Sequence, residues 1–273
     1  MLYQRIDLCA GGRVYMNACL YQPSEELPAL QKRPAVVICP GGGYQMCSDR
    51  EADPIAAAYL AAGYHVFVLY YSLGEDAAYP APLYDISRAL AYIRAHAEQW
   101  GVIEHQIAVC GFSAGGHLAA CLGTLWNRPD IQAAAGVTGD QNRPNGLILG
   151  YPVITTAWML KRGEETYTRI AGALRPEQAE QLLNCDRNVG AHTPPAFLFH
   201  TGEDQVVPVT DSLRFASAMQ QAGRPYELHI FPQGWHGAAL ATTLTGWEAP
   251  GVEQWMALSV NWLNRLFDFP PKA

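Results

Sequence analysis

The segment Gly111-Phe112-Ser113-Ala114-Gly115 restricts the possible folds of this chain more than any other part of it. It lies between the apolar run Ile107–Cys110 and the helix-like run Leu118–Leu125. This order predicts a strand that turns sharply into a helix, with Ser113 at the turn in a strained backbone conformation. The two glycines remove side chains that would collide with the backbone. We therefore expect the Ser113 hydroxyl at the carboxyl end of a strand, beside a helix N-terminus that favours developing negative charge.

The composition narrows the class of protein. A chain of 273 residues, 49% of them hydrophobic and only 16% charged, can bury one large α/β core. Its net charge of −7, with no basic stretch to neutralise phosphates, argues against a nucleic-acid partner. The apolar runs reach only strand length, which argues against a membrane-spanning helix. Residues 1–7 lack the basic and apolar regions of a secretory signal, so we expect a cytoplasmic protein.

Apolar runs of strand length alternate with helix-like runs along most of the chain. This alternation predicts a mostly parallel central sheet with helices on both faces, and ligands then bind beyond the carboxyl ends of the strands. Strands are expected at 3–8 and 14–21 (an antiparallel hairpin), 35–39, 66–71, 107–110, 146–152, 195–200 and 226–231, and helices at 53–62, 83–100, 118–125, 209–222 and 253–267.

One stretch, residues 153–194, interrupts this alternation. It contains helix-like segments near 164–172 and 176–183, and no part of it fits a strand. We expect residues 1–273 to form a single domain, in which 153–194 is a small helical cap inserted over the site.

A glycine-rich loop, Pro40-Gly41-Gly42-Gly43-Tyr44, directly follows the buried strand predicted at 35–39. Taken alone it could be a flexible turn. Beside a nucleophilic serine, however, the loop can also have a catalytic role, because acyl transfer needs backbone N–H donors aimed at an oxyanion. We expect these donors to be Gly42 or Gly43, together with Ala114, the residue after the serine.

A serine hydroxyl needs a base, and the base needs an orienting acid. Among eight histidines, His236 stands out because it lies in the loop Gln233–Gly237 after the last strand, flanked by glycines. Asp204, in the loop after the strand ending at 200, is the predicted acid. Glu203 is the nearest competitor, whereas Asp211 falls inside the next helix. The resulting order, serine, acid, histidine, is that of one widespread hydrolase fold.

Taken together, these motifs resemble the esterase/lipase branch of the α/β-hydrolases, near bacterial acetyl esterases and acetyl-xylan-esterase-like enzymes. The resemblance implies an α/β-hydrolase fold and a serine esterase that forms an acyl-enzyme and needs no cofactor. Pro40 departs from the pattern, since the common form of this loop begins with histidine. The matching segments are 40–44, 111–117, 193–201, Asp204 with Val207-Pro208, and 234–237.

The bond cleaved and the substrate are less constrained than the fold. The same branch resembles formamidases and some peptidases, so an amide hydrolase stays an alternative, and a non-catalytic binding protein on this scaffold is a remote one. We expect short-acyl esters, acetyl above all and including those of sugars. Tyr44 and Trp235 are expected to line a compact pocket, and the mixed charges of 153–194 do not suit a lipid-facing lid.

Neither a C-x-x-C pair nor a histidine-rich cluster is present, so no metal site is expected. The seven cysteines, with Cys39 and Cys110 in apolar runs, predict buried reduced thiols. His117, just after the serine, is assigned to packing. The expected partner is a small-molecule ester, with neither nucleic acid nor membrane, and a homodimer stays open.

Overall fold

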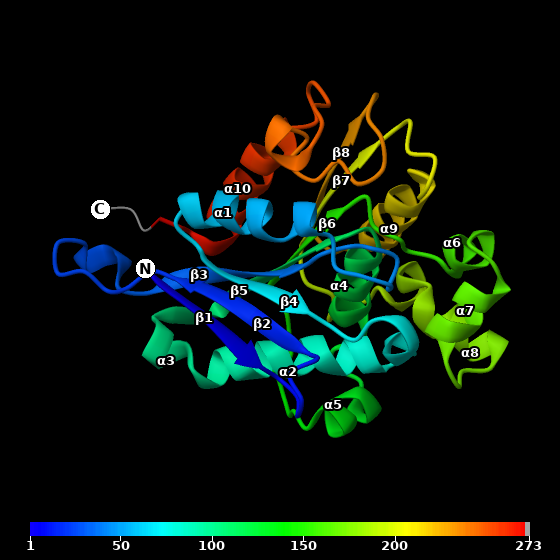
Figure 1. Ribbon diagram of the computed structural model, residues 1–273, viewed down its shortest axis with the longest axis horizontal. Coiled ribbons are helices and arrows are strands. Elements are labelled where there is room, and N and C mark those ends of the chain that lie inside the picture. Colours follow the sequence, from blue (N-terminus) through cyan, green and yellow to red (C-terminus); the bar gives the residue numbers. More distant parts are fainter. Residues whose placement is uncertain (271–273) are drawn as a thin grey trace.

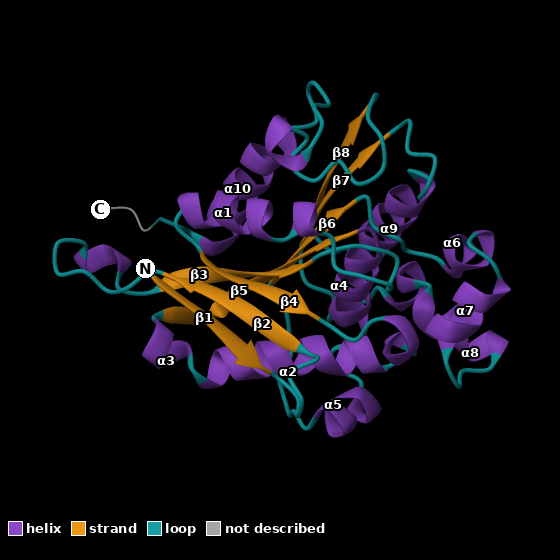
Figure 2. Ribbon diagram, in the orientation of Figure 1, coloured by secondary structure: helices purple, strands orange, loops and turns teal. Residues whose placement is uncertain are grey.

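Eight strands form one sheet in the order β1-β2-β4-β3-β5-β6-β7-β8. The protein is represented by a computed structural model that describes residues 1–270 (Figures 1 and 2). β2 pairs antiparallel with β1 and with β4, and every other neighbouring pair is parallel. The strands are β1 (Leu2–Asp7), β2 (Tyr15–Leu20), β3 (Arg33–Cys39), β4 (His65–Tyr70), β5 (Val102–Phe112), β6 (Gly146–Gly150), β7 (Ala196–Thr201) and β8 (Tyr226–Phe231).

Helices cover both faces of the sheet (Figure 1). α1 and α10 pack on one face, and α2, α4 and α9 pack on the other. The α-helices are α1 (Asp53–Ala61), α2 (Ala81–Ala95), α3 (Ala97–Trp100), α4 (Ser113–Leu125), α5 (Pro129–Ala135), α6 (Thr156–Lys161), α7 (Glu164–Ala171), α8 (Pro176–Leu183), α9 (Thr210–Gln221) and α10 (Gln254–Phe267), and the short 3₁₀ helices are η1 (Pro28–Leu30), η2 (Asp49–Glu51), η3 (Gly74–Ala77), η4 (Cys185–Asn188) and η5 (Thr243–Thr245).

The central strands are apolar throughout because both of their faces are covered. Along β3, Val37 contributes to the core beneath α2 and α4, whereas Val36 and Ile38 contribute to the core beneath α1 and α10. All seven residues of β3 are buried. A parallel strand covered on both faces needs this continuous apolar run rather than an alternating one.

The predicted architecture, a mostly parallel sheet between two helical layers, is confirmed, and the predicted N-terminal hairpin is present as β1 and β2. The strand expected at 107–110 is longer, Val102–Phe112, and the helices differ in three details. The helix expected at 83–100 is divided at His96 into α2 and α3, where the His96 ring stacks against Trp100. α4 begins at Ser113 itself rather than at 118, so the serine is the first helical residue. α5 and α6 were not expected, because each is too short to show a helical period.

Residues 153–194 contain α6, α7, α8 and η4 and no strand. They lie together beyond the ends of β6 and β7, at the right of Figure 1.

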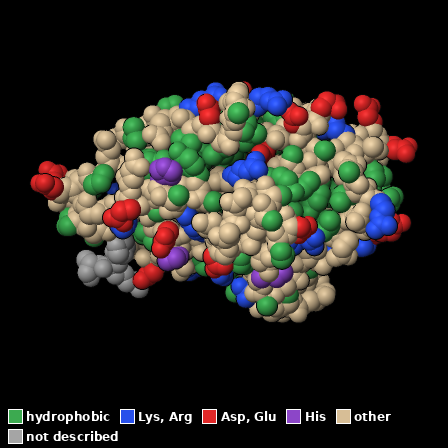
Figure 3. Space-filling model, turned by 90° about the horizontal axis from the view of Figure 1, so that it is seen from below, with side chains coloured by type: hydrophobic (Ala, Val, Ile, Leu, Met, Phe, Trp, Pro, Cys, Tyr) green, Lys and Arg blue, Asp and Glu red, His purple; other side chains and the backbone are tan. Residues whose placement is uncertain are grey.

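Among the described residues, no helix has the length and apolar character needed to cross a bilayer. Figure 3 shows one face of the molecule, on which acidic and basic side chains are mixed in small groups.

Candidate active site

Ser113 lies at the junction of β5 and α4, with a φ of 51°. Left-handed backbone at a non-glycine residue costs on the order of 1 kcal/mol, and the packing around it maintains this strain. A side chain at position 115 would collide with the carbonyl oxygen of Cys39, and one at 111 would collide with the carbonyl oxygen of Gly115. The structure therefore supports the prediction that positions 111 and 115 need glycine because a side chain there would collide with the backbone.

The loops after β7 and β8 bring two predicted residues to Ser113. The Oγ of Ser113 lies 2.8 Å from Nε2 of His236, and Nδ1 of His236 lies 2.6 Å from Oδ2 of Asp204. The other carboxylate oxygen of Asp204 accepts the N–H groups of Val206 and Val207, each at 2.9 Å. These bonds fix the carboxylate, which can in turn hold the imidazole with its Nε2 facing the serine.

A second histidine, which the sequence analysis did not select, also contacts Asp204. Nε2 of His200 lies 3.3 Å from Oδ2 of Asp204, and its Nδ1 lies 2.8 Å from Oγ of Ser212. Burial would raise the pKa of Asp204, but hydrogen bonds from His200 and His236 outweigh it and hold that pKa well below its usual range. The carboxylate therefore stays ionised at neutral pH. The sequence did contain a signal for this contact, because His200 ends a predicted strand and lies four residues before Asp204.

The glycine-rich loop lies directly beside the serine. Gly42 and Gly43 have φ values of 128° and 65°, and a side chain at position 42 would collide with the carbonyl oxygen of Met46. The N–H of Gly41 is already used, because it donates to Oε2 of Glu51 at 2.7 Å. Gly42 and Gly43 thus remain the candidates for the loop donor, with Ala114 at the start of α4 as the candidate second donor.

The sequence analysis also missed Glu51 and Tyr151. The hydroxyl of Tyr151 donates to Oε1 of Glu51 at 2.7 Å and accepts the N–H of Ala239 at 3.0 Å. The rings of Tyr151 and His236 have centroids 5.1 Å apart. Burial raises the pKa of Glu51. Neither residue has a local sequence signal, because their contact joins positions 100 residues apart.

A cavity of about 370 Å³ contains Ser113 and His236. Its lining includes Trp158, which carries a buried indole N–H without a hydrogen-bond partner among the described residues. The side chains that 153–194 contributes to this cavity are Trp158, Arg162, Thr166 and Arg169. The predicted insertion therefore forms part of the wall around the serine.

The two predicted substrate-binding aromatics lie in different environments. Tyr44 is only 3% exposed, and its hydroxyl lies 2.8 Å from Nδ1 of His117. It is not among the residues that line the cavity with Ser113, so nothing in this position supports the role expected for Tyr44. The loop turns the ring inward at Tyr44, whose φ is 60°. Trp235 is 68% exposed and lines a surface pocket of about 620 Å³ that includes His236.

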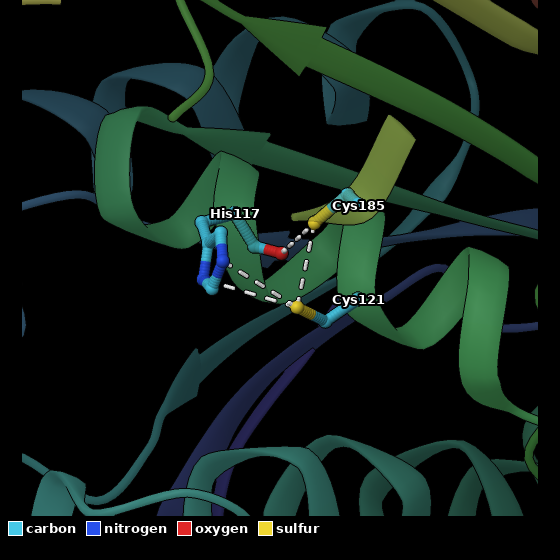
Figure 4. Close-up of side chains that lie close together, drawn as sticks. All are labelled: His117, Cys121 and Cys185. Atoms are coloured by element: carbon cyan, nitrogen blue, oxygen red, sulfur yellow. Dashed lines mark hydrogen bonds between the residues drawn. The ribbon is translucent and has the colours of Figure 1, made fainter. Parts of the chain in front are cut away.

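Potential metal ligands meet at a different place from Ser113. His117 and Cys121 of α4 and Cys185 of η4 are all buried, and their donor atoms lie within 4.8 Å of one another (Figure 4). The sequence analysis expected no such cluster, since Cys185 is 64 residues from Cys121.

Comparisons with known proteins identify a family and several relatives of this chain. The BD-FAE family matches residues 20–219. Endo-1,4-beta-xylanase B of Butyrivibrio fibrisolvens is 33% identical over 79% of this chain and 34% of its own length. An acetylxylan esterase of Xylanibacter ruminicola is 31% identical over 79% of this chain and 43% of its own length. The chain thus spans less than half the length of either relative.

Solved structures match over almost the whole chain. An acetyl ester-xyloside bifunctional hydrolase from Caldicellulosiruptor lactoaceticus has a TM-score of 0.81 at 30% identity, covering 97% of this chain and 96% of that one. A carboxylesterase from Lactobacillus plantarum has a TM-score of 0.86 at 29% identity, covering 97% and 98%.

Proposed function

Because the chain belongs to the BD-FAE family, we propose that it is a carboxylic ester hydrolase of the serine type that removes short acyl groups, acetyl above all, from sugar esters. The reacting residues in this proposal are Ser113, His236 and Asp204. The observation that carries it is the continuous hydrogen-bonded path from Asp204 through His236 to Ser113, with distances of 2.6 and 2.8 Å.

The proposed reaction has two halves. In the first, His236 takes the proton of Ser113 as the serine oxygen attacks the ester carbonyl, and then gives that proton to the leaving alcohol. In the second, water attacks the acyl-enzyme, and the same imidazole accepts a proton from the water and returns it to Ser113. Asp204, ionised and fixed by two backbone N–H groups, stabilises the imidazolium formed in each half.

The developing oxyanion is assigned to backbone donors. In the proposal these are the N–H groups of Ala114 and of Gly42 or Gly43. The positive end of α4 adds to their effect, because Ser113 is its first residue. Removing one such donor in a comparable enzyme costs about 10²–10³ in kcat.

The proposal of short acyl groups and sugar alcohols rests on the cavity. Four residues of 153–194 line it, and two of these are the arginines Arg162 and Arg169. A long acyl chain would need a continuous apolar groove, since each buried methylene is worth about 0.8 kcal/mol. A wall of this polarity suits the hydroxyl groups of a sugar better. Two relatives, an acetylxylan esterase and an acetyl ester-xyloside hydrolase, also support an acetylated sugar substrate.

The test is a substrate panel. The specificity constant kcat/KM is measured for aryl esters with two, four and eight acyl carbons, for an acetylated xylo-oligosaccharide and for a matched aryl amide, with Ser113→Ala as the blank. We expect the acetyl esters to react fastest and the amide to react much more slowly. A value that rises steadily with chain length would reject the short-acyl assignment, and a faster amide would reject the ester assignment.

A further inference from the structure

His117, Cys121 and Cys185 form a cluster that the proposed reaction does not use (Figure 4). We propose that these three side chains bind one Zn²⁺ ion inside the protein, at a site distinct from Ser113. The inference goes beyond the esterase activity and does not depend on it.

The donor atoms of the cluster lie within 4.8 Å of one another, and the 3.9 Å between Sγ of Cys121 and Nδ1 of His117 is close to the spacing of two zinc ligands. The sulfur atoms of Cys121 and Cys185 are 3.4 Å apart, and Sγ of Cys121 lies 3.6 Å from Nε2 and 3.9 Å from Nδ1 of His117. In a tetrahedral site with usual bond lengths, two sulfur ligands are about 3.8 Å apart, and a sulfur and a nitrogen ligand are about 3.6 Å apart. A zinc ion would thus need the side chains of Cys121, Cys185 and His117 to adjust around it.

The surroundings of His117 orient its ring for this role. Its Nε2 lies 2.9 Å from the carbonyl oxygen of Leu183, so an N–H at Nε2 donates there and leaves the lone pair on Nδ1. A histidine that binds a metal usually donates its second N–H to a carbonyl or a carboxylate in this way. The hydroxyl of Tyr44 lies 2.8 Å from Nδ1, in the position the ion would take, so the Tyr44 side chain would move aside when zinc binds.

Beside the cluster lies space for a fourth ligand. A small cavity of about 20 Å³, lined by Tyr44, Tyr79, His117 and Cys121 among others, is large enough for one water molecule. The hydroxyl of Tyr79 is buried and has no hydrogen-bond partner among the described residues. A water completing the coordination of the zinc ion would have the tyrosines Tyr44 and Tyr79 as polar neighbours in a cavity otherwise lined mainly by apolar residues.

Charge and ligand type also favour zinc. Two thiolates cancel the charge of Zn²⁺, so the filled site adds no net charge to the core, where an uncompensated charge would be costly. Cysteine and histidine are the donors that zinc prefers. Binding requires ionised thiols, so the ion would displace the protons of both cysteines as it enters the site.

The site would link two elements of the fold. His117 and Cys121 lie on α4, the helix that begins at Ser113, and Cys185 lies in η4 near the end of 153–194. The backbone N–H of Cys185 is also bonded to the carbonyl oxygen of Ile154, near the start of that segment, at 2.9 Å. An ion bound only by the folded chain would raise its unfolding temperature.

The experiment uses the whole chain, kept reduced and freed of metal by dialysis against a chelator. Zn²⁺ is titrated while the metal content and the unfolding midpoint are measured, and Co²⁺ serves as a coloured substitute whose thiolate charge-transfer band reports sulfur ligation. We expect about one ion per chain. Cys121→Ser and Cys185→Ser should each weaken binding by about tenfold or more, whereas Cys110→Ser, a buried cysteine outside the cluster, should not.

Three results would overturn the site. They are wild-type protein that takes up no Zn²⁺, a Co²⁺ complex without thiolate bands, and equal binding by the Cys121→Ser/Cys185→Ser double variant. A disulfide between Cys121 and Cys185 that persists in the reduced sample, seen as a mass loss of two hydrogens, would also overturn it. The cobalt spectrum of the wild type decides the matter even if a serine variant fails to fold.

Discussion

The hydroxyl of Tyr151 donates to the buried carboxylate of Glu51, with an Oη–Oε1 distance of 2.7 Å. The second carboxylate oxygen holds the N–H of Gly41, and the Tyr151 hydroxyl also accepts the N–H of Ala239. This pair therefore joins the glycine-rich loop on one side of Ser113 to the chain just after His236 on the other.

The first prediction concerns this pair. Glu51→Gln and Tyr151→Phe should each lower kcat by roughly 10–100-fold, because small displacements of groups around a reacting centre cost about that much. The rate of Ser113 labelling by a serine-reactive phosphonate should fall in parallel, which a loss of substrate affinity alone would not cause. Asp49→Asn, an exposed neighbour in η2, is the control. Labelling at wild-type rates in folded Glu51→Gln would show that the pair does not position the loops.

The second prediction concerns the strain at Ser113. Ser113→Ala and Ser113→Gly should both lose activity, by about 10⁶ in kcat if this enzyme resembles a comparable triad hydrolase. Because residue 113 has a φ of 51°, glycine should be the more stable of the two, by about 1 kcal/mol. Urea unfolding of both variants measures the difference. An alanine variant as stable as the glycine variant would mean that the turn carries no such strain.

The third prediction separates two neighbouring acids. Asp204→Asn should lower kcat by about 10⁴, since an amide can hold the imidazole in the wrong tautomer. Glu203→Gln should have a much smaller effect, because Glu203 only accepts the N–H of Gly234, at 3.3 Å. Steady-state kinetics on an acetyl ester rank the two variants. The reverse ranking would make Glu203 the orienting residue.

The fourth prediction concerns stability in acid. His65 is buried with Nδ1 accepting the N–H of Tyr21 and Nε2 donating to the carbonyl of Gly101, an arrangement that only the neutral ring can make. Burial lowers its pKa from 6.5 to about 4. Below about pH 6.5 the unfolded chain therefore binds a proton that the folded chain does not, so stability falls as the pH drops towards 4.

Between neutral pH and about pH 5 this single group should cost about 2 kcal/mol of unfolding free energy. His65→Gln keeps a hydrogen-bond donor and an acceptor but has no group that takes up this proton. Between neutral pH and about pH 5, its free energy of unfolding should therefore fall by about 2 kcal/mol less than that of the wild type. Urea unfolding at both pH values provides the measurement, with His105→Gln, an exposed histidine, as the control. If the wild type and His65→Gln lose the same unfolding free energy between the two pH values, His65 is not the cause of the loss.

Features that depend on neighbouring residues could be predicted from the amino-acid sequence. Continuous apolar runs predict strands buried on both faces, and the glycines at 111 and 115 predict the turn that displays Ser113. Ser113, Asp204 and His236 each follow a predicted strand, and the carboxyl ends of parallel strands meet at one edge of a sheet. This reasoning from the sequence places all three residues at the same edge, and the folded chain brings them into hydrogen-bond contact.

Contacts between distant segments, in contrast, required the folded chain. The Glu51–Tyr151 pair joins residues 100 positions apart, and Cys121 meets Cys185 across 64 positions. The position of Tyr44 also could not be predicted, because the ring turns inward to His117 rather than toward the serine. A local pattern reports which face of a strand or helix is apolar, but side-chain pairing across the fold depends on how loops and helices pack against one another.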